Sequence, residues 1–281
     1  MTKTAVLLTL ITAVAGMPAQ AQPAQQVLAF VSGHGVDSQS CTLTQPCRTF
    51  QRAFNTIPPN GVIWVLDPAD YQPLTITHGV SIQAGGMGAI TVTSGAAITV
   101  SVTTSDPVTL NGLVLDGVGT GQNGINITHG PSVQILNSVV HHFSIGILDG
   151  TFDSGSTLLI EDTVTSDNWT GVAIEPNNAG TAKATLNRIT ANNNMYGVTT
   201  AGRHPLTKLG HDTTIANSVL SNNDTGLSAQ GGVTWLAKTV ISGNTTGVEV
   251  GGTPVYSYGD NYIRDNGRPV NGDALTPVMT Q

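Results

Sequence analysis

The sequence predicts an all-β protein, a right-handed parallel β-helix of about eight to ten coils. Its composition and an internal repeat carry this prediction. Only 10% of the 281 residues are charged, against roughly 25% in an average soluble domain. The chain is instead rich in glycine (33), threonine (39) and asparagine (20). Such a composition favours strands joined by tight turns over helices.

The repeat begins near residue 108 and is anchored by a glycine that an aliphatic residue follows. The anchor glycines are Gly124, Gly146, Gly171, Gly197, Gly226 and Gly247, spaced 21 to 29 residues apart. An asparagine stands three residues before each of the last four. Units of this length hold two or three short strands and must stack as coils, whereas a propeller blade needs about 40 residues. We therefore expect aliphatic ladders inside the coils and an asparagine ladder at a bend.

The first 21 residues have the pattern of a secretory signal. Lys3 precedes an apolar run over residues 5–14, and Ala19–Ala21 forms a small-x-small cleavage site. The run is shorter than the roughly 20 residues that span a membrane. We therefore expect a secreted or periplasmic protein without a membrane span. In that oxidising environment Cys41 and Cys47, in an N-terminal segment of residues 22–47, are expected to form a disulfide.

The segment after the cysteines predicts a capping helix. Residues 49–56 place Phe50, Ala53 and Phe54 at helical spacing, and a Pro/Asn/Gly turn ends the pattern at Gly61. A short helix here would close the first coil, since the terminal units of a solenoid are atypical. The β-helix itself is predicted over residues 48–267, with a C-terminal tail over residues 268–281.

This opening resembles a known class of proteins. The sequence from Cys47 to Gly61, followed by Ile63-Trp-Val-Leu-Asp-Pro-Ala-Asp-Tyr71, is similar to the start of right-handed parallel β-helix proteins of the pectin-lyase-like class. The chain as a whole resembles exported bacterial members of it, over most of residues 28–267. The resemblance implies the fold. It does not imply one activity, because the class holds lyases, hydrolases, esterases and epimerases beside adhesins and spikes without chemistry.

The catalytic motifs of this class do not transfer to the chain. Gly33-His34-Gly35 lacks a paired aspartate nearby, and Arg203-His204-Pro205 lacks the second arginine of a lyase motif. No motif supports a cofactor, and calcium, although possible, has no clustered aspartates to hold it. His141 and His142 are adjacent, and neighbouring residues of a strand point to opposite faces. We therefore predict no metal site.

Three consecutive coils carry insertions at the same corner. The step from anchor glycine to the next aliphatic strand residue is 14, 15 and 18 residues after Gly146, Gly171 and Gly197, but 10 or 11 in the coils on either side. Such insertions stack on one face of a solenoid, often the binding face. They contain the candidate catalytic residues Asp149, Asp153, Glu175, His204 and His211 and the candidate ligand-binding residues Phe152, Asn177, Arg203 and Lys208. Carboxylates beside His or Arg suit acid–base chemistry or glycan binding, and an aromatic ring can stack on a sugar.

The net charge of the protein limits the classes of binding partner that we expect. A charge of −7 and a pI near 5.3 disfavour a nucleic-acid partner. The leading hypothesis is recognition of a polysaccharide or cell-surface glycan. Two alternatives remain open. One is a divergent polysaccharide lyase or glycoside hydrolase acting at the stacked loops, and the other is a structural surface or assembly module.

Overall fold

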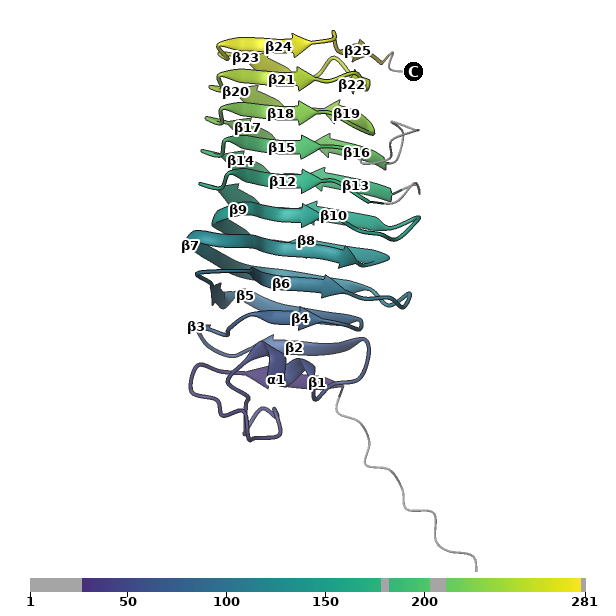
Figure 1. The fold of residues 1–281 in the computed structure, drawn as a ribbon. Coiled ribbons are helices and arrows are strands. Elements are labelled where there is room, and N and C mark those ends of the chain that lie inside the picture. Colours follow the sequence, from purple (N-terminus) through teal and green to yellow (C-terminus); the bar gives the residue numbers. More distant parts are fainter. Residues whose placement is uncertain (1–26, 178–181, 203–210, 279–281) are drawn as a thin grey trace, which may run out of the picture.

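The computed structural model describes residues 27–177, 182–202 and 211–278, which form a parallel β-solenoid (Figure 1). The chain winds through three ladders of strands, and every pairing between named strands in these ranges is parallel. The all-β prediction and the parallel β-helix architecture are therefore confirmed.

The three ladders take their strands in a fixed order around each coil. The first ladder contains β1 (Leu28–Val31), β2 (Gly61–Val65), the starts of β5 (Val80–Thr91) and β7 (Val108–His129), β8 (Ser132–Leu136), β10 (Thr157–Glu161), β13 (Ala182–Asn187), β16 (His211–Ala216), β19 (Val233–Ala237), β22 (Val255–Ser257) and β25 (Thr276–Pro277). The second contains β3 (Ala69–Asp70), later parts of β5 and β7, the start of β9 (Val139–Asp149), β11 (Val164–Ser166), β14 (Thr190–Asn192), β17 (Val219–Ser221), β20 (Val240–Ser242) and β23 (Tyr262–Arg264). The third contains β4 (Leu74–Ile76), β6 (Ala96–Ser101), the ends of β7 and β9, β12 (Thr170–Ile174), β15 (Tyr196–Thr200), β18 (Thr225–Ala229), β21 (Thr246–Val250) and β24 (Arg268–Gly272).

About seven turns make up the regular solenoid, and they correspond to the stretch from β7 to β24 that carries the sequence repeat. The sequence predicted eight to ten coils because it also counted the shorter, less regular strands before residue 108. The boundaries of 48–267 stay a prediction, and strand pairing continues on both sides of them. β1 already pairs with β2 ahead of them, and β24 and β25 extend two ladders beyond residue 267.

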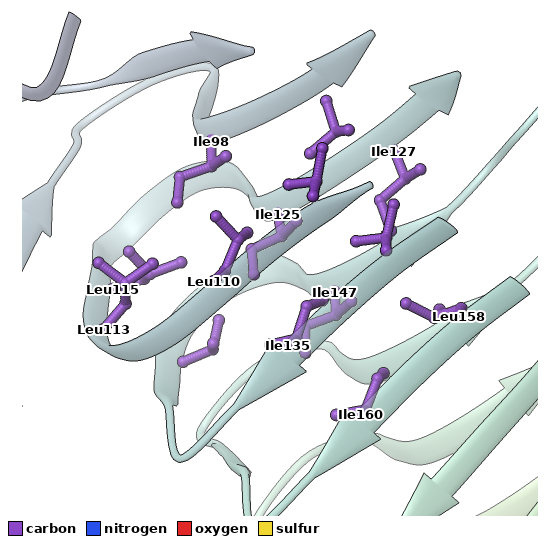
Figure 2. Packing of buried hydrophobic residues seen from close by; sticks show 14 of the residues in the cluster. Ile98, Leu110, Leu113, Leu115, Ile125, Ile127, Ile135, Ile147, Leu158 and Ile160 are labelled. Carbon is purple, nitrogen blue, oxygen red and sulfur yellow. The ribbon is translucent and has the colours of Figure 1, made fainter. Parts of the chain in front are cut away.

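Aliphatic side chains fill the interior of the coils. Ile135, Ile160, Leu186, Ile215 and Leu236 are fully buried and occupy one register of the first ladder. Figure 2 shows Leu110, Ile135 and Ile160 among this cluster, with residues of the other ladders facing them. Burying a side chain of this size contributes roughly 1.5–3 kcal/mol, so the stacked aliphatics predicted from the repeat are the main source of stability.

The anchor glycines are needed because successive coils approach closely. A Cβ atom built on Gly146, Gly171 or Gly197 would lie 2.6 Å from the carbonyl oxygen of the next anchor glycine. A side chain there would push two coils apart.

The asparagine ladder is present and buried between the second and third ladders. Each Asn side chain donates through Nδ2 to the Oδ1 of the next, at 3.1 Å from Asn168 to Asn194 and from Asn194 to Asn223. The left-handed backbone of this corner belongs to the residue before each ladder asparagine, with φ of 57° at Asn193 and 56° at Asn222.

The N-terminal end differs from the prediction. No separate capping helix is evident, because residues 49–56 form only the five-residue α1 (Phe50–Phe54), which packs beside β1, β2 and β4. Pro58 limits its length, since the residue before a proline avoids helical backbone. The helix starts at Thr49, whose side chain accepts a hydrogen bond from the backbone N–H of Arg52 at 3.2 Å. Phe50 and Phe54 are buried.

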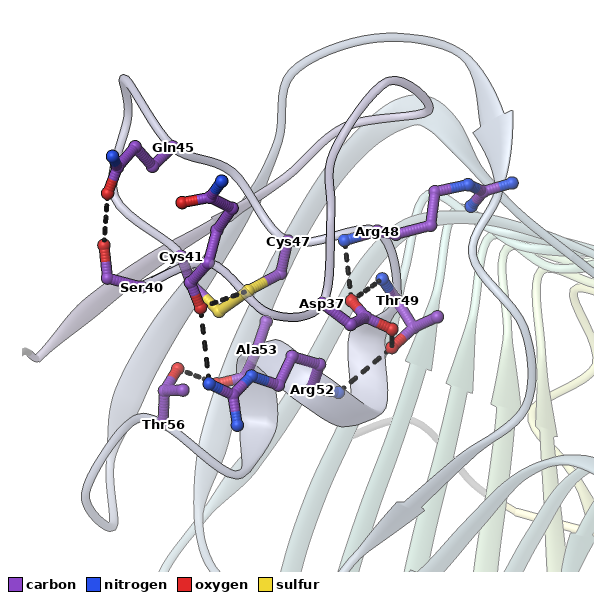
Figure 3. The surroundings of a disulfide bond; sticks show 11 residues. Asp37, Ser40, Cys41, Gln45, Cys47, Arg48, Thr49, Arg52, Ala53 and Thr56 are labelled. Carbon is purple, nitrogen blue, oxygen red and sulfur yellow. Dashed lines mark hydrogen bonds between the residues drawn. A yellow bond between two sulfur atoms is a disulfide. The ribbon is translucent and has the colours of Figure 1, made fainter.

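Cys41 and Cys47 form the predicted disulfide, shown in Figure 3. Asp37 joins its loop to the helix, because one carboxylate oxygen accepts the N–H groups of Arg48 and Thr49 at 2.8 and 3.0 Å. A disulfide of this kind is typical of proteins outside the cytoplasm. The predicted signal at residues 1–21 lies outside the described residues. Within the described ranges, no helix has the length and apolar character needed to cross a membrane.

Candidate functional site

The insertion loops begin as continuations of the third ladder. The N–H of Phe152 donates to the carbonyl of Thr128, and the N–H of Asn177 donates to the carbonyl of Thr151, at 3.0 and 2.8 Å. The Asn177 side chain also donates to the Gly150 carbonyl at 2.7 Å. The first two predicted insertions are therefore stacked where they leave the ladder, as the repeat analysis expected.

A shallow depression of about 350 Å³ lies at the first insertion. Its lining comes from three successive coils, after β6, β7 and β9. They contribute Val102, Thr103, Thr104, Ser105, Pro131, Phe152, Asp153 and Ser154. The Phe152 side chain stands at this depression with 53% of its surface exposed. An aromatic ring is thus accessible among several hydroxyl groups.

Asp153 is held in a fixed orientation at the same place. Its Oδ1 lies 3.0 Å from Nδ1 of His129, and its Oδ2 accepts the N–H of Gly130 at 2.7 Å. The Phe152 and His129 rings have centroids 5.6 Å apart. Because both carboxylate oxygens are engaged, the loop presents a rigid group of carboxylate, imidazole and aromatic ring.

Asp149 does not belong to this accessible group. Its side chain is buried at the end of β9, with only 4% of the residue exposed. Burial raises its pKa to about 6, the neighbouring Asp153 adds to the rise, and the Thr151 N–H opposes it. The predicted candidate is therefore enclosed by the protein, and its carboxyl group stays protonated to a higher pH than an exposed one does.

His211 is also sealed from solvent, at the start of β16. It is 4% exposed, and within the described ranges neither ring nitrogen has a hydrogen-bond partner. Burial lowers its pKa to about 4, although Asp212 opposes the shift. The ring packs against Gly232, where an added Cβ would lie 2.4 Å from Nε2. The imidazole is therefore enclosed by the fold, and burial favours its uncharged form.

The remaining predicted residues are divided between the surface and the undescribed segments. Asn177 is exposed and Glu175 half-buried, and the Glu175 N–H donates to the Asp149 carbonyl at 2.8 Å. The candidates Arg203, His204 and Lys208 lie outside the described residues. The structure thus brings together Phe152 and Asp153 and places Asn177 one coil further along.

Sequence reasoning missed two parts of this face. His129 ends β7 in a coil without an insertion, and Thr103–Ser105 belong to the region before the repeat, so the sequence predicted a role for neither.

The sequence also predicted no role for Trp235. Its ring stacks on Tyr256 of the next coil, with centroids 4.4 Å apart and an angle of 18°. The two residues are register partners on the first ladder, and an aromatic at equivalent positions of adjacent units was the available signal.

A second cluster corrects the argument against His141 and His142. Their Nδ1 atoms lie 2.9 Å apart, and Nδ1 of His142 lies 3.0 Å from Oδ1 of Asp116. The expectation of opposite faces fails because His142 has a φ of 62° and turns a corner there. Partial burial opposes ionisation of Asp116, but hydrogen bonds from the Val118 N–H and from His142 hold its pKa below the ordinary value.

Comparison with known proteins identifies the fold. No protein-family model and no curated protein matches the chain. Among solved structures, the crystal structure of pectate lyase Pel9A is similar, with a TM-score of 0.53 and 15% sequence identity over 85% of this chain and 73% of that chain. The likeness at this identity concerns the fold alone. It confirms the parallel β-helix fold expected from the sequence.

Proposed function

We propose that this protein is exported and recognises a neutral polysaccharide with the face formed by the first ladder and the insertion loops. The observation that carries the proposal is the exposed ring of Phe152 beside the fixed Asp153–His129 pair, at a depression lined by hydroxyl groups. Sugar rings offer an apolar face for stacking and hydroxyl groups for hydrogen bonds, and this group complements both.

A second aromatic position is formed by the stacked rings of Trp235 and Tyr256 on the first ladder. The insertion that carries Phe152 precedes β10, and three ladder steps separate β10 from β19. At about 4.8 Å per step, this places Trp235 roughly 15 Å along the solenoid axis. A polymer of several sugar units, rather than a single sugar, fits two aromatic positions at that spacing.

The charge of the surface favours a neutral chain. Among the described residues that line the depression, the charged side chain is the carboxylate of Asp153, and no lysine or arginine is included. Like charges repel, so this group disfavours a polyuronate. The net charge of −7 has the same sign.

Recognition fits the arrangement better than hydrolysis. Glycoside hydrolases use two carboxyl groups that face the bond being broken, about 5–10 Å apart. Here Asp153 reaches the surface with both oxygens engaged, whereas Asp149 is buried. The described part of the depression therefore supplies one accessible carboxylate.

Affinity electrophoresis through gels containing single polysaccharides tests the proposal. Galactan, xylan and β-glucan serve as neutral probes, and polygalacturonate and alginate as acidic probes. We expect retardation by a neutral polymer, and at least about tenfold weaker binding for Phe152→Ala and for Trp235→Ala, as for an aromatic residue at the centre of an interface.

Tyr262→Ala is the matched control, because Tyr262 is an exposed aromatic on the second ladder. Equal loss of binding in this control, or binding to acidic polymers only, would contradict the proposal. Assays for new reducing ends and unsaturated products on the same polymers separate recognition from cleavage, and product formation would favour the enzyme hypothesis.

A further inference from the structure

We propose that Asp116, His141 and His142 form a binding site for a divalent transition-metal ion such as Zn²⁺. Asp116 on β7 and His141 on β9 are register partners in the second ladder, and His142 follows at the corner. One ligand atom from each of the three lies within 4.8 Å of the others. The inference does not depend on the glycan site.

The distances suit a tetrahedral ion. Nδ1 of His141 lies 2.9 Å from Nδ1 of His142 and 3.9 Å from Oδ1 of Asp116, and the third separation, from His142 to Asp116, is 3.0 Å. Ligands about 2.0–2.1 Å from a tetrahedral zinc ion are separated from one another by roughly 3.3 Å. The three atoms therefore need to move by only a few tenths of an ångström to share one ion.

Hydrogen bonds alone cannot satisfy Nδ1 of His141, Nδ1 of His142 and Oδ1 of Asp116 at the same time. Each imidazole Nδ1 carries either one hydrogen or one lone pair in the ring plane. A single hydrogen on Nδ1 of His142 would have to serve both Asp116 and His141, since both acceptors lie within 3.0 Å. A cation instead accepts all three lone pairs at once. The N–H of Val118 donates to the Asp116 carboxylate at 2.8 Å, which fixes its orientation.

The backbone at His142 turns the corner between the second and third ladders with a positive φ. The equivalent corners of later coils are Asp167, Asn193, Asn222 and Gly243, all with positive φ. These residue types, and histidine with them, are the ones that adopt this conformation most often. The corner brings the side chain of His142 toward that of His141.

The ligand types select the class of ion. Two imidazoles and one carboxylate suit zinc, copper or nickel, whereas calcium takes six to eight oxygen ligands. Three protein ligands leave at least one coordination position for water or a bound molecule. His142 also lines a depression of about 320 Å³ together with Phe143, Trp169 and Met195, so the open position is near a surface that can hold a ligand.

Calorimetric titration of the metal-stripped protein with Zn²⁺ and with Ca²⁺ is the direct test. We expect one equivalent of Zn²⁺ to bind, with at least tenfold preference over Ca²⁺. Co²⁺ is a second probe, since its visible absorption reports a low-coordinate site with nitrogen ligands. Zn²⁺ should also raise the unfolding temperature, because an ion that binds only the native state stabilises it.

The later coils provide variants that the fold accepts. His141→Ser introduces the residue of its register partner Ser166, and His142→Asn introduces that of the corner at Asn193. Each should weaken Zn²⁺ binding at least tenfold and abolish the thermal shift, while the metal-free variants unfold no earlier than the parent. His34→Asn, a histidine outside the cluster, should bind as the parent does. Absence of stoichiometric binding, or unchanged affinity in both cluster variants, would overturn the proposal.

Discussion

Asp149 and His211 are both buried at the base of the insertion loops, and their pKa values move in directions that keep each side chain uncharged. The pKa of Asp149 rises to about 6 and that of His211 falls to about 4. As pH rises from about 4 to about 6, the native state loses stability through Asp149 and gains it through His211. The parent protein should therefore show little net change over this range.

Asp149→Asn is expected to remove the first of these opposing effects. Below about pH 4 the carboxyl group is protonated in both states, so the free energies of unfolding of variant and parent should be similar. Above about pH 6 the native parent bears a buried charge at a cost of up to about 3 kcal/mol, which the variant avoids. Because the effect of His211 remains, the free energy of unfolding of the variant should rise with pH between 4 and 7. Chemical denaturation at several pH values measures this, and parallel curves for the two proteins would contradict it.

At the scale of the element, the asparagine ladder holds the bend of the coils that carry Asn168, Asn194, Asn223 and Asn244. Asn223 donates through Nδ2 to the Ala191 carbonyl at 3.0 Å and to Asn244 at 3.1 Å, and its Oδ1 accepts the N–H of Asn194 at 2.9 Å. Each buried polar group left without a partner costs about 1–3 kcal/mol. The ladder is thus a set of coupled hydrogen bonds that fixes three coils at a time.

Asn223→Ala should lower the free energy of unfolding by at least about 3 kcal/mol, because the partners of the side chain remain buried. The adjacent Asn222 is exposed and has a φ of 56°, so Asn222→Gly should change stability by no more than about 1 kcal/mol. Urea denaturation of both variants compares them. Similar losses would show that the corner conformation, and not the buried ladder, holds the bend.

The two corners of each coil also differ in what the sequence revealed. At the corner between the first and second ladders, the residues nine positions before the anchor glycines all have positive φ; they are Asn137, Asp162, Arg188, Asn217 and Lys238. Arg188 and Asp162 form an ion pair there, with Arg188 Nε 2.7 Å from Asp162 Oδ1. The corner at His142 lacks the Asn, Asp or Gly found at the same corner of later coils. The sequence therefore did not predict that His141 and His142 lie close together.

At the scale of the whole molecule, each coil is stabilised by its neighbours, so the position of a defect decides its effect. Gly171 lies in the middle of the solenoid and Gly247 near its end. An added Cβ would lie 2.6 Å from a carbonyl oxygen of the next coil at either site, Gly197 or Pro269. Substitutions at Gly171 and Gly247 therefore introduce similar local strain at different places along the solenoid.

Gly171→Ala is expected to lower the unfolding temperature of the whole protein. Gly247→Ala should promote local unfolding of the last coil and leave the stability of the other coils unchanged. Native-state hydrogen exchange measures both. The terminal variant should show faster exchange confined to β22 through β25, and the central one faster exchange on both sides of β12. An identical drop in unfolding temperature with uniform exchange in both variants would argue against nearest-neighbour stability.

The sequence by itself determined the class of fold, because short units with a repeating pattern of aliphatic, asparagine and glycine residues bury their apolar faces only by stacking on one another. It also located the insertions and the disulfide, which follow from the periodicity of the repeat and from the spacing of the cysteines. Only the tertiary structure decided which polar residues meet. Asp149 and His211 are buried, Asp153 pairs with His129 of the preceding coil, and His141 and His142 converge on Asp116. These contacts depend on register between coils and on single backbone angles, neither of which the identity of a residue specifies.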